Sequence, residues 1–478
     1  MSMYRQYING RMVEGKGRPL EVLNPATGEV VGIVGTATAD QAKEALESAQ
    51  KAFRTWSKTS VNERISWILK LREACMEERE VFIDLVSRES GRLYSQACGD
   101  VDWFFLSFIY YTDEVKRING MTFPAMASVP GSAYHIVEHQ PLGVTVGHVA
   151  WNYPMGNMSI KLCPSLAAGC PCIIKPSSQT PLSALHVGEI AAKIGFPAGV
   201  LNIISGSSNE VGKTLNSSDI PRMISLIGST ETGLKIMQEA ATSVKKFSFE
   251  LGGNAPVIVM DDADPDAVAD NIVAKKTGFA GQTCVNYNRI YVHEKIYRIL
   301  GEKIAERVQK FVPGKGRDQG PVINPMIDRK ARDRMLDLIS EAVSQGATLA
   351  AGGTIPQGFE NGNYIMPALL MDVTDRMRVS KEEIFGPIIP LQPFSSLNQA
   401  LEQANDTQSG LSAYFFGHRS PEIAKAFEMF HAGEIFVNGG GGTEFTPHAG
   451  TKQSGIGCDR SRWSLEEYFD IKYISLVP

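Results

Sequence analysis

Residues 201–233, LNIISGSSNEVGKTLNSSDIPRMISLIGSTETG, contain two short apolar runs that alternate with two helical patterns. The apolar runs cover 201–204 and 222–227, and the helical patterns cover 208–215 and 230–241. Short apolar runs of this kind indicate strands buried on both faces, and their alternation with helices predicts parallel βαβ units. The stretch therefore predicts an α/β fold that binds ligands at the carboxyl ends of its strands.

The same alternation extends in both directions from this stretch. Before it we expect strands at 143–149 and 172–175 and helices at 155–168 and 182–194. After it we expect strands at 257–260 and 289–293. The helices expected in this later part start at 264 or cover 295–311 and 328–345. A second α/β domain over 255–440 is the simplest interpretation.

The N-terminal part predicts a different set of elements. Asn9-Gly10 is typical of a two-residue hairpin turn. A helix over 42–53, a long helix from Asn62 to Glu89 and an aromatic-rich helix over 99–118 are expected next. Residues 120–140 then lose the helical pattern and predict an extended arm or hairpin.

Composition excludes several classes of protein. The chain has 478 residues, 43% of them hydrophobic, and a net charge of −5, so it lacks the general basic footprint of a nucleic-acid-binding protein. No apolar run reaches membrane-spanning length, and the first residues do not resemble a signal peptide. Seven scattered cysteines favour reduced thiols and a cytoplasmic location, and no metal site is expected, because Cys170 and Cys172 suit core thiols better than ligands.

Cys284 lies in a glycine-containing loop, 279–289, between a helical pattern that stops near Gly278 and a predicted strand. A thiol on such a loop can be exposed and aimed, as a nucleophile needs. A small core residue is the alternative for a lone cysteine.

Two segments suggest a phosphate-binding site. Gly228 to Gly233 follows a predicted strand and opens a predicted helix, whose N-terminal N–H groups suit a phosphate. Lys175 ends an earlier strand, where its ammonium can reach a ribose or a phosphate. The dinucleotide fingerprint GxGxxG is absent, so loops that merely turn the chain remain an equal alternative.

Glu250 and Asn152 are the candidates for proton transfer and oxyanion binding. Glu250 lies between Phe249 and Leu251, so it is expected to be partly buried with a raised pKa, which suits a general base. Asn152 follows a predicted strand, where its amide can donate to an oxyanion. A surface position for Glu250 and a turn-forming role for Asn152 are the alternatives.

Six motifs together resemble the NAD(P)-dependent aldehyde dehydrogenase superfamily, and most of all its succinate-semialdehyde dehydrogenase branch. They stand in the order and spacing of that family and are Trp151-Asn-Tyr-Pro, Lys175-Pro-Ser-Ser-Gln-Thr-Pro, Gly228-Ser-Thr-Glu-Thr-Gly, Glu250-Leu-Gly-Gly, Gly281-Gln-Thr-Cys284 and Glu383-Ile-Phe-Gly-Pro387. The resemblance covers nearly the whole chain and implies the family's oxidation of an aldehyde with NAD or NADP.

The resemblance assigns roles to individual residues. It implies that Cys284 is the nucleophile, that Asn152 and the Cys284 backbone N–H hold the oxyanion, and that Glu250 activates the hydrolytic water. The residues that it places against the cofactor are Trp151, Lys175, Ser178, Gly228, Ser229, Glu383 and Phe385. Lys161 matches a supporting lysine behind the site.

The family fold implies a Rossmann-like cofactor domain, an α/β catalytic domain and a β oligomerisation arm. On this chain they correspond to 1–119 with 141–249, to 250–445, and to 120–140 with 446–478. A homodimer or homotetramer is implied, with a small aldehyde as substrate and neither nucleic acid nor membrane as partner.

Departures from the family pattern concern the cofactor and the substrate. Position 178, a carboxylate in many NAD-preferring members, is serine here, so NADP should be accepted and even preferred. Two arginines of the succinate-semialdehyde branch are replaced by Ile160 and Gly278, which weakens the case for that substrate. Arg460 or Arg462 can supply another cation, with solvated surface charges as the alternative.

We therefore expect a non-acylating enzyme acting on a small polar, semialdehyde-like aldehyde. The alternatives are a CoA-acylating semialdehyde dehydrogenase, succinate semialdehyde as the specific substrate, a thiol hydrolase, and a binding protein that retains the fold. Glu250 argues against acyl transfer to CoA, which needs no water-activating base.

Overall fold

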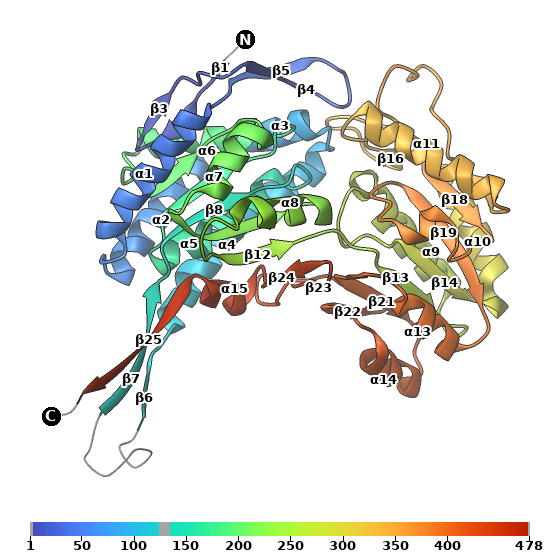
Figure 1. The fold of residues 1–478 in the computed structure, drawn as a ribbon. Coiled ribbons are helices and arrows are strands. Elements are labelled where there is room, and N and C mark those ends of the chain that lie inside the picture. Colours follow the sequence, from blue (N-terminus) through green and yellow to red (C-terminus); the bar gives the residue numbers. More distant parts are fainter. Residues whose placement is uncertain (1–2, 124–133, 477–478) are drawn as a thin grey trace.

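The largest sheet of the computed structural model, which describes residues 3–123 and 134–476, is built mainly from the N-terminal half of the chain (Figure 1). Its eight strands follow the order β24-β12-β11-β8-β9-β10-β2-β3, and the five from β12 to β10 are parallel. The parallel strands are β8 Val144–His148, β9 Cys172–Lys175, β10 Leu201–Ile203, β11 Pro221–Ile227 and β12 Lys246–Glu250. The antiparallel edge strands are β2 Gln6–Ile8, β3 Arg11–Val13 and β24 Gly455–Ile456. The predicted parallel βαβ architecture is confirmed.

The predicted Asn9-Gly10 hairpin joins β2 to β3. Both residues have positive φ, 52° and 79°, as a type I′ turn requires. Gly10 also lies against Ala198, whose Cβ would be 3.0 Å from an added Cβ at position 10.

Helices cover both faces of this sheet. On one face lie α1 Ala39–Trp56 and α7 Lys213–Ser217. On the other face lie α5 Pro154–Ala168 and α6 Leu182–Lys193. Outside these two helices lie α2 Val61–Glu77, α3 Arg79–Ser90 and α4 Tyr94–Glu114. Strand alternation separates the two cores, because Ile173 packs in the cluster that contains α1 and Ile174 in the cluster that contains α5. Within the described ranges, no helix has a stretch long and apolar enough to cross a bilayer.

The single long helix expected from Asn62 to Glu89 is wrong, because α2 and α3 are separate helices that meet at Glu78. Glu78 leaves the helical conformation with φ −107° and ψ 25°. Its carboxylate is held by α6, with Oε2 2.8 Å from His186 Nε2. A tertiary contact therefore accompanies the break, and no glycine or proline marks it in the sequence.

A second sheet of seven strands follows in the order β17-β18-β19-β14-β13-β21-β22. All its pairs except β17–β18 are parallel, which confirms the second α/β unit. The strands are β13 Pro256–Val259, β14 Arg289–His293, β17 Thr348–Ala351, β18 Ala368–Met371, β19 Ile388–Phe394, β21 Ser412–Phe416 and β22 Glu434–Val437. The principal helices around it are α9 Pro265–Thr277, α10 Glu294–Val308, α11 Arg329–Ser344, α13 Leu397–Asn405 and α14 Ser420–Met429.

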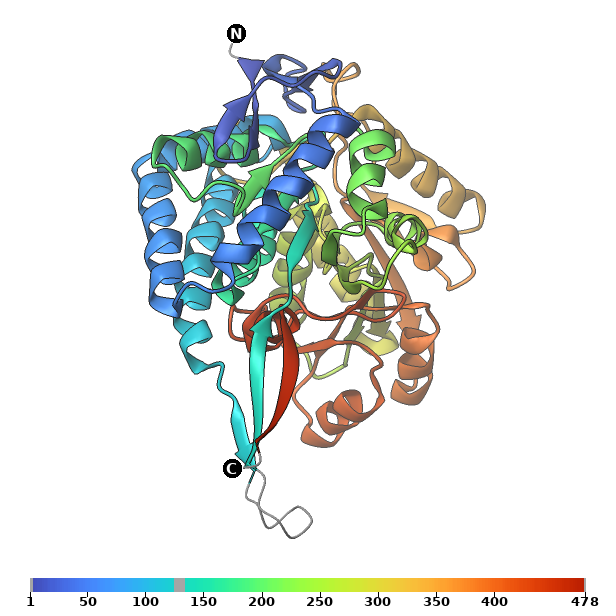
Figure 2. The same cartoon turned by 60° about the vertical axis from the view of Figure 1, so that its left-hand side comes forward.

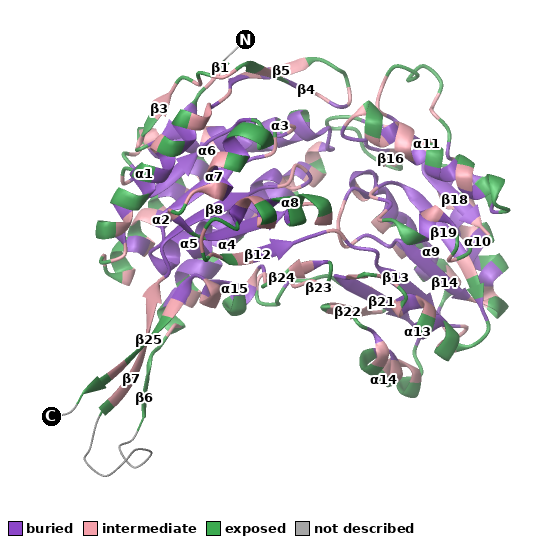
Figure 3. Cartoon of the chain, viewed as in Figure 1, coloured by how far each residue is buried: buried purple, intermediate pink, exposed green. Residues whose placement is uncertain are grey.

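A three-stranded antiparallel sheet projects from the body of the molecule (Figures 1 and 2). It consists of β6 Met121–Phe123, β7 Tyr134–Pro141 and β25 Phe469–Leu476, with β25 paired along the whole of β7. Much of its surface is exposed (Figure 3). The excursion expected over 120–140 is thus extended at both ends, and residues 124–133 lie outside the described part of the chain.

Candidate active site

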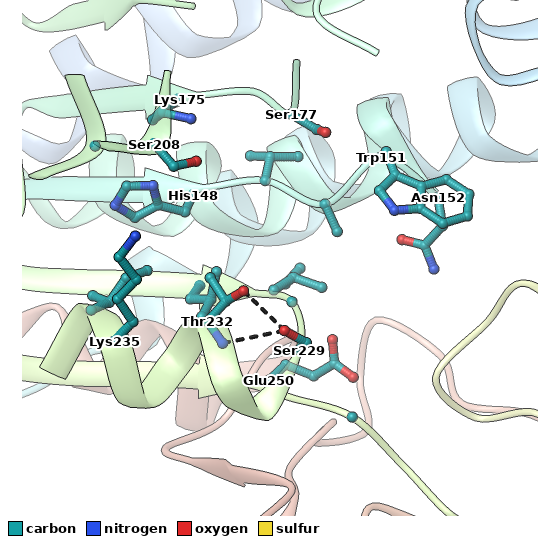
Figure 4. Close-up of a pocket in the computed structure, with 18 of the residues that line it drawn as sticks. His148, Trp151, Asn152, Lys175, Ser177, Ser208, Ser229, Thr232, Lys235 and Glu250 are labelled. Atoms are coloured by element: carbon teal, nitrogen blue, oxygen red, sulfur yellow. Dashed lines mark hydrogen bonds between the residues drawn. The ribbon is translucent and has the colours of Figure 1, made fainter. Parts of the chain in front are cut away.

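A cavity opens where the connections of the first sheet reverse direction. From β8 the chain moves outward through β9 and β10, and then returns to the other side of β8 to form β11 and β12. Such a switch point at the carboxyl ends of parallel strands is the usual ligand site of an open α/β sheet. Residues at four strand ends, His148, Lys175, Ile227 and Glu250, line a cavity of about 420 Å³ there (Figure 4).

The structure gathers the ten predicted catalytic and cofactor-binding residues around this one cavity. The ten residues that the sequence singled out and that line it are Trp151, Asn152, Lys175, Ser178, Gly228, Ser229, Glu250, Cys284, Glu383 and Phe385. They come from both large sheets and from segments more than 200 residues apart. Their proximity is therefore a property of the folded chain.

The loop that carries Cys284 is sharply turned and firmly held. After α9 ends at Thr277, three consecutive residues, 279–281, adopt positive φ values of 48°, 50° and 73°. Gln282 ties the turn down, because its Nε2 donates to the carbonyls of Phe279 and Pro325 and its Oε1 accepts from the backbone N–H of Ile327. Left-handed non-glycine residues are strained and persist only where such contacts hold them, so these contacts fix the path of the chain leading to Cys284.

Asn152 is placed beside this loop by the start of α5. The buried carboxylate of Asp100 accepts from the backbone N–H groups of Met155 (3.2 Å) and Gly156 (2.9 Å), which satisfies the helix N-terminus. Asn152 Nδ2 donates to the carbonyl of Gln282 at 3.2 Å. One of its two amide hydrogens therefore remains for another acceptor.

Glu250 is buried, but the raised pKa expected for it is wrong. Burial would raise the pKa of this carboxyl, whereas His448, the Cys284 thiol and the charge of Lys161 favour its ionised form, and the pKa is lowered overall. Glu250 Oε1 lies 3.5 Å from His448 Nε2. The expectation failed because it considered only the neighbouring Phe249 and Leu251.

His448 is a residue of this site that the sequence did not assign. It is buried, and its Nδ1 lies 3.0 Å from Glu434 Oε1 while its Nε2 faces Glu250. Burial opposes a charge on this imidazole, but the two carboxylates raise its pKa to about 9. Only the unusual composition of the segment Thr446-Pro-His-Ala-Gly-Thr451 marks it in the sequence.

Lys161 is also placed behind the site, with a partner that the sequence did not reveal. Its Nζ lies 2.5 Å and 2.8 Å from the two carboxylate oxygens of Asp459, and both side chains are buried. The backbones of Asp459 and His448 form an antiparallel bridge through two 2.8 Å hydrogen bonds. The C-terminal segment thus closes the site around Glu250.

The thiol of Cys284 is uncharged in this arrangement. Burial and the nearby carboxylates of Glu250 and Glu383 raise its pKa well above the ordinary value, and Arg460 opposes them. The thiol sulfur and a carboxylate oxygen of Glu250 lie within 4.8 Å of each other. The pair can therefore form a thiolate by passing the thiol proton to the carboxylate.

The opposite part of the cavity suits a phosphate-bearing ligand. Ser229 caps α8 (Thr230–Ala240) by accepting from Thr232 N–H at 3.2 Å (Figure 4). Lys175 is buried in the cavity wall, and burial lowers its pKa to about 8. Burial also raises the pKa of Glu383 to about 8. His148 and Lys235 join the lining without having been predicted.

A second cavity, of about 340 Å³, approaches Cys284 through its neighbours Thr283 and Val285. Its lining includes two cations that the sequence did not single out. Arg92 lies between the rings of Tyr153 and Phe279, 3.9 Å from each ring centre. Lys275 is partly buried, and its pKa is lowered by burial although Cys284 and Glu434 favour its charge.

Arg460 and Arg462 have different surroundings. Arg460 places its guanidinium 4.5 Å from the ring centre of Trp103, and its charge acts on both Cys284 and His448. Its backbone is left-handed, with φ 59°. Arg462 is exposed and pairs with Glu466 at 2.7 Å. Of the two candidate cations, Arg460 is therefore the one near the thiol.

Comparison with known proteins agrees with this geometry. The model of the "Aldehyde dehydrogenase family" matches residues 12–474. Glutarate-semialdehyde dehydrogenase of Pseudomonas putida is 37% identical over 99% of this chain and 98% of its own length, and succinate-semialdehyde dehydrogenase [NADP(+)] of Escherichia coli is 37% identical over the same shares. The crystal structure of an aldehyde dehydrogenase from Brucella melitensis biovar abortus superposes with a TM-score of 0.95 at 38% identity, over 99% of this chain and 97% of that one. The chain belongs to the aldehyde dehydrogenase family.

Proposed function

We propose that the protein oxidises a small polar aldehyde to its carboxylic acid with NAD or NADP, through a thioester on Cys284. The observation that supports this most directly is the meeting of Cys284, Glu250 and Asn152 at one cavity. The same cavity carries a helix N-terminus and a buried lysine that fit the phosphates and ribose of a dinucleotide.

Each residue has a defined task in this reaction. Cys284 gives its proton to Glu250 and attacks the aldehyde carbon as a thiolate. The free amide hydrogen of Asn152 and the Cys284 backbone N–H donate to the resulting oxyanion. The bound cofactor supplies the acceptor for the hydride that leaves this carbon. Glu250, which has to be deprotonated again by then, takes a proton from the water that hydrolyses the thioester.

A panel of short aldehydes tests the proposal. Acidic, hydroxylated, sulfonated and neutral members are compared by kcat/KM with NAD and with NADP, with and without CoA. Formation of free acid with stoichiometric NAD(P)H is expected. Acyl-CoA as the main product would establish the CoA-acylating alternative, and no turnover of any member would overturn the proposal.

The surroundings of position 178 favour acceptance of NADP. Ser178 is exposed at the cavity that Lys175 lines, so no carboxylate at this position repels a 2′-phosphate. One close relative is named as an NADP(+) enzyme, in agreement with this assignment.

Introducing a carboxylate by Ser178→Glu is expected to shift the preference toward NAD. Repulsion between like charges about 4 Å apart near a surface is roughly 1–4 kcal/mol, so the NADP/NAD ratio of kcat/KM should fall about tenfold or more. Ser178→Ala, which adds no charge, should change the ratio little. An unchanged ratio in Ser178→Glu would exclude this position as a determinant.

Arg460 and Lys275 favour an aldehyde with an acidic distal group. Both cations lie within electrostatic range of Cys284. Lys275 is on the last turn of α9, which Gly278 caps, whereas Arg460 comes from the C-terminal segment. The two relatives described above act, by name, on aldehydes that carry a carboxylate. Succinate semialdehyde is one member of this class of substrates. The kcat/KM values measured with the aldehyde panel identify the preferred member.

Removing the charge with Arg460→Met is expected to lower kcat/KM selectively for acidic aldehydes. A charge-assisted hydrogen bond contributes about 1.5–3 kcal/mol, so kcat/KM for acidic substrates should fall roughly 10- to 100-fold. Neutral aldehydes of similar length should be affected much less. Arg462→Met is the matched control, because that guanidinium is exposed and paired with Glu466. An equal loss for acidic and neutral substrates would refute the assignment.

We also propose that the projecting sheet is an oligomerisation arm. Large apolar side chains are exposed on it, among them Met121, Phe123, Tyr134, Ile471 and Tyr473, which favours a homodimer or homotetramer. The two large sheets support a division into a cofactor domain (1–119 and 141–249), a catalytic domain (250–445) and an arm with the C-terminal strand (120–140 and 446–478). The seven free cysteines support a cytoplasmic location.

A further inference from the structure

We propose that Cys284, His448 and Glu250 form a binding site for a thiophilic divalent cation such as Zn²⁺, and that its occupation reversibly blocks the enzyme. The thiol sulfur, an imidazole nitrogen and a carboxylate oxygen of these residues all lie within 4.8 Å of one another. Sulfur, nitrogen and oxygen are the donors that Zn²⁺ uses in proteins, and three protein ligands with one open position is a common arrangement for it.

His448 is oriented as a metal ligand would be. Its Nδ1 is held by Glu434 Oε1 at 3.0 Å, which directs Nε2 toward Glu250 and the thiol. A histidine that binds a metal usually donates its other ring N–H to a carboxylate, which fixes the ring and makes the ligand nitrogen more basic. Glu434 supplies this partner from the start of β22.

The charges around the cluster permit a cation despite two positive side chains. Arg460 and Lys275 oppose binding, while Glu434 adds to the negative charge of Glu250 and of the thiolate that forms on binding. Glu383 adds little near neutral pH, because burial raises its pKa to about 8. The positive charge of Lys161 is balanced by the carboxylate of Asp459, with which it forms an ion pair. The negative groups therefore outnumber the free cations around the three ligand atoms.

An ion can reach these ligands and would compete with catalysis. Glu250 and Cys284 both line the large cavity, so the cluster is open on that side. Binding releases the thiol proton and the proton on His448 Nε2, and the thiolate, the imidazole and the Glu250 carboxylate then hold the metal. The nucleophile and the base would then be occupied together, and removal of the ion by a chelator would restore both.

The test measures binding of Zn²⁺ alone to the chelator-treated full-length protein, without cofactor or aldehyde. One equivalent per chain is expected in competition with a chromogenic chelator. Cys284→Ser and His448→Gln should lose this equivalent, and Glu434→Gln should bind about 10- to 100-fold more weakly. Cys98→Ser is the control, because that partly exposed thiol on α4 lies outside the cluster.

Two measurements on the unaltered protein keep the test independent of variant folding. Co²⁺ should produce a thiolate-to-metal charge-transfer band that Cys284→Ser lacks. Zn²⁺ should protect Cys284, but not Cys98, from alkylation, and EDTA should reverse the protection. Absence of a bound equivalent, or binding that persists in both Cys284→Ser and His448→Gln, would overturn the metal site. Because none of these measurements uses turnover, they leave the proposed oxidation to its own test.

Discussion

Cys284→Ala is expected to reduce aldehyde-dependent formation of NAD(P)H by at least about 10³-fold, the largest effect of any single substitution in this chain. The variant lacks the atom that would form the thiohemiacetal, and among the described residues no other cysteine lines the cavity. The left-handed turn over 279–281 is held by Gln282, whose contacts do not involve the thiol. The fold and the cofactor cavity should therefore persist.

The measurement is a progress curve with a saturating aldehyde, accompanied by NAD(P)H binding to the free variant. Binding should be close to that of the unaltered protein, which would separate lost chemistry from lost structure. Cys98→Ala is the matched control and should keep full activity. Substantial turnover by Cys284→Ala would show that another group is the nucleophile.

Glu250→Gln is expected to separate the two halves of the reaction. An amide cannot take a proton from water, so the thioester should accumulate after a burst of up to one NAD(P)H per active site. The following steady rate should fall about 10²- to 10⁴-fold, the usual range for loss of a general base. The burst itself should be slower, because Glu250 also accepts the thiol proton.

Rapid mixing and mass spectrometry check this expectation. The burst amplitude should scale with the enzyme concentration, and the acyl group should be found on Cys284. Glu302→Gln, at an exposed position on α10, is a matched control with no expected effect. A steady rate equal to that of the unaltered protein would exclude Glu250 as the base.

The ionisation of Glu250 also predicts how activity depends on pH. His448 and Lys161 lower the pKa of this carboxyl against the opposing effect of burial. The basic form therefore persists to lower pH than it would in an apolar pocket, and Glu250 should not limit hydrolysis near neutral pH.

Local patterns were sufficient to predict much of the fold. The strands and helices between Val144 and Ala240 follow from short apolar runs and helical periodicity, because both are properties of neighbouring residues. The Asn9-Gly10 turn is equally local. The break at Glu78 was missed because the sequence there carries no breaking residue, and the contact with His186 comes from a helix more than 100 residues away.

The candidate site shows the same limit. The ten predicted residues that line it were found from motifs, whereas His448, which lowers the pKa of Glu250, and Asp459, the partner of Lys161, were not. His448 and Asp459 lie about 200 residues further along the chain, and their contacts depend on β24 joining the edge of β12. The residues around Glu250 carry no pattern from which the pairing of β12 with the distant strand β24 could be predicted.

The ion pair between Lys161 and Asp459 has a consequence for the time at which the site is completed. The two residues are 298 positions apart, so the lysine emerges from the ribosome long before its counter-ion. A buried pair that lacks one member is destabilised by about 3–5 kcal/mol, and the β24 contact with Glu250 is missing over the same interval. The thiol, the base and their supports thus come together only after the segment around Asp459 has been synthesised, and a shorter nascent chain lacks the completed site.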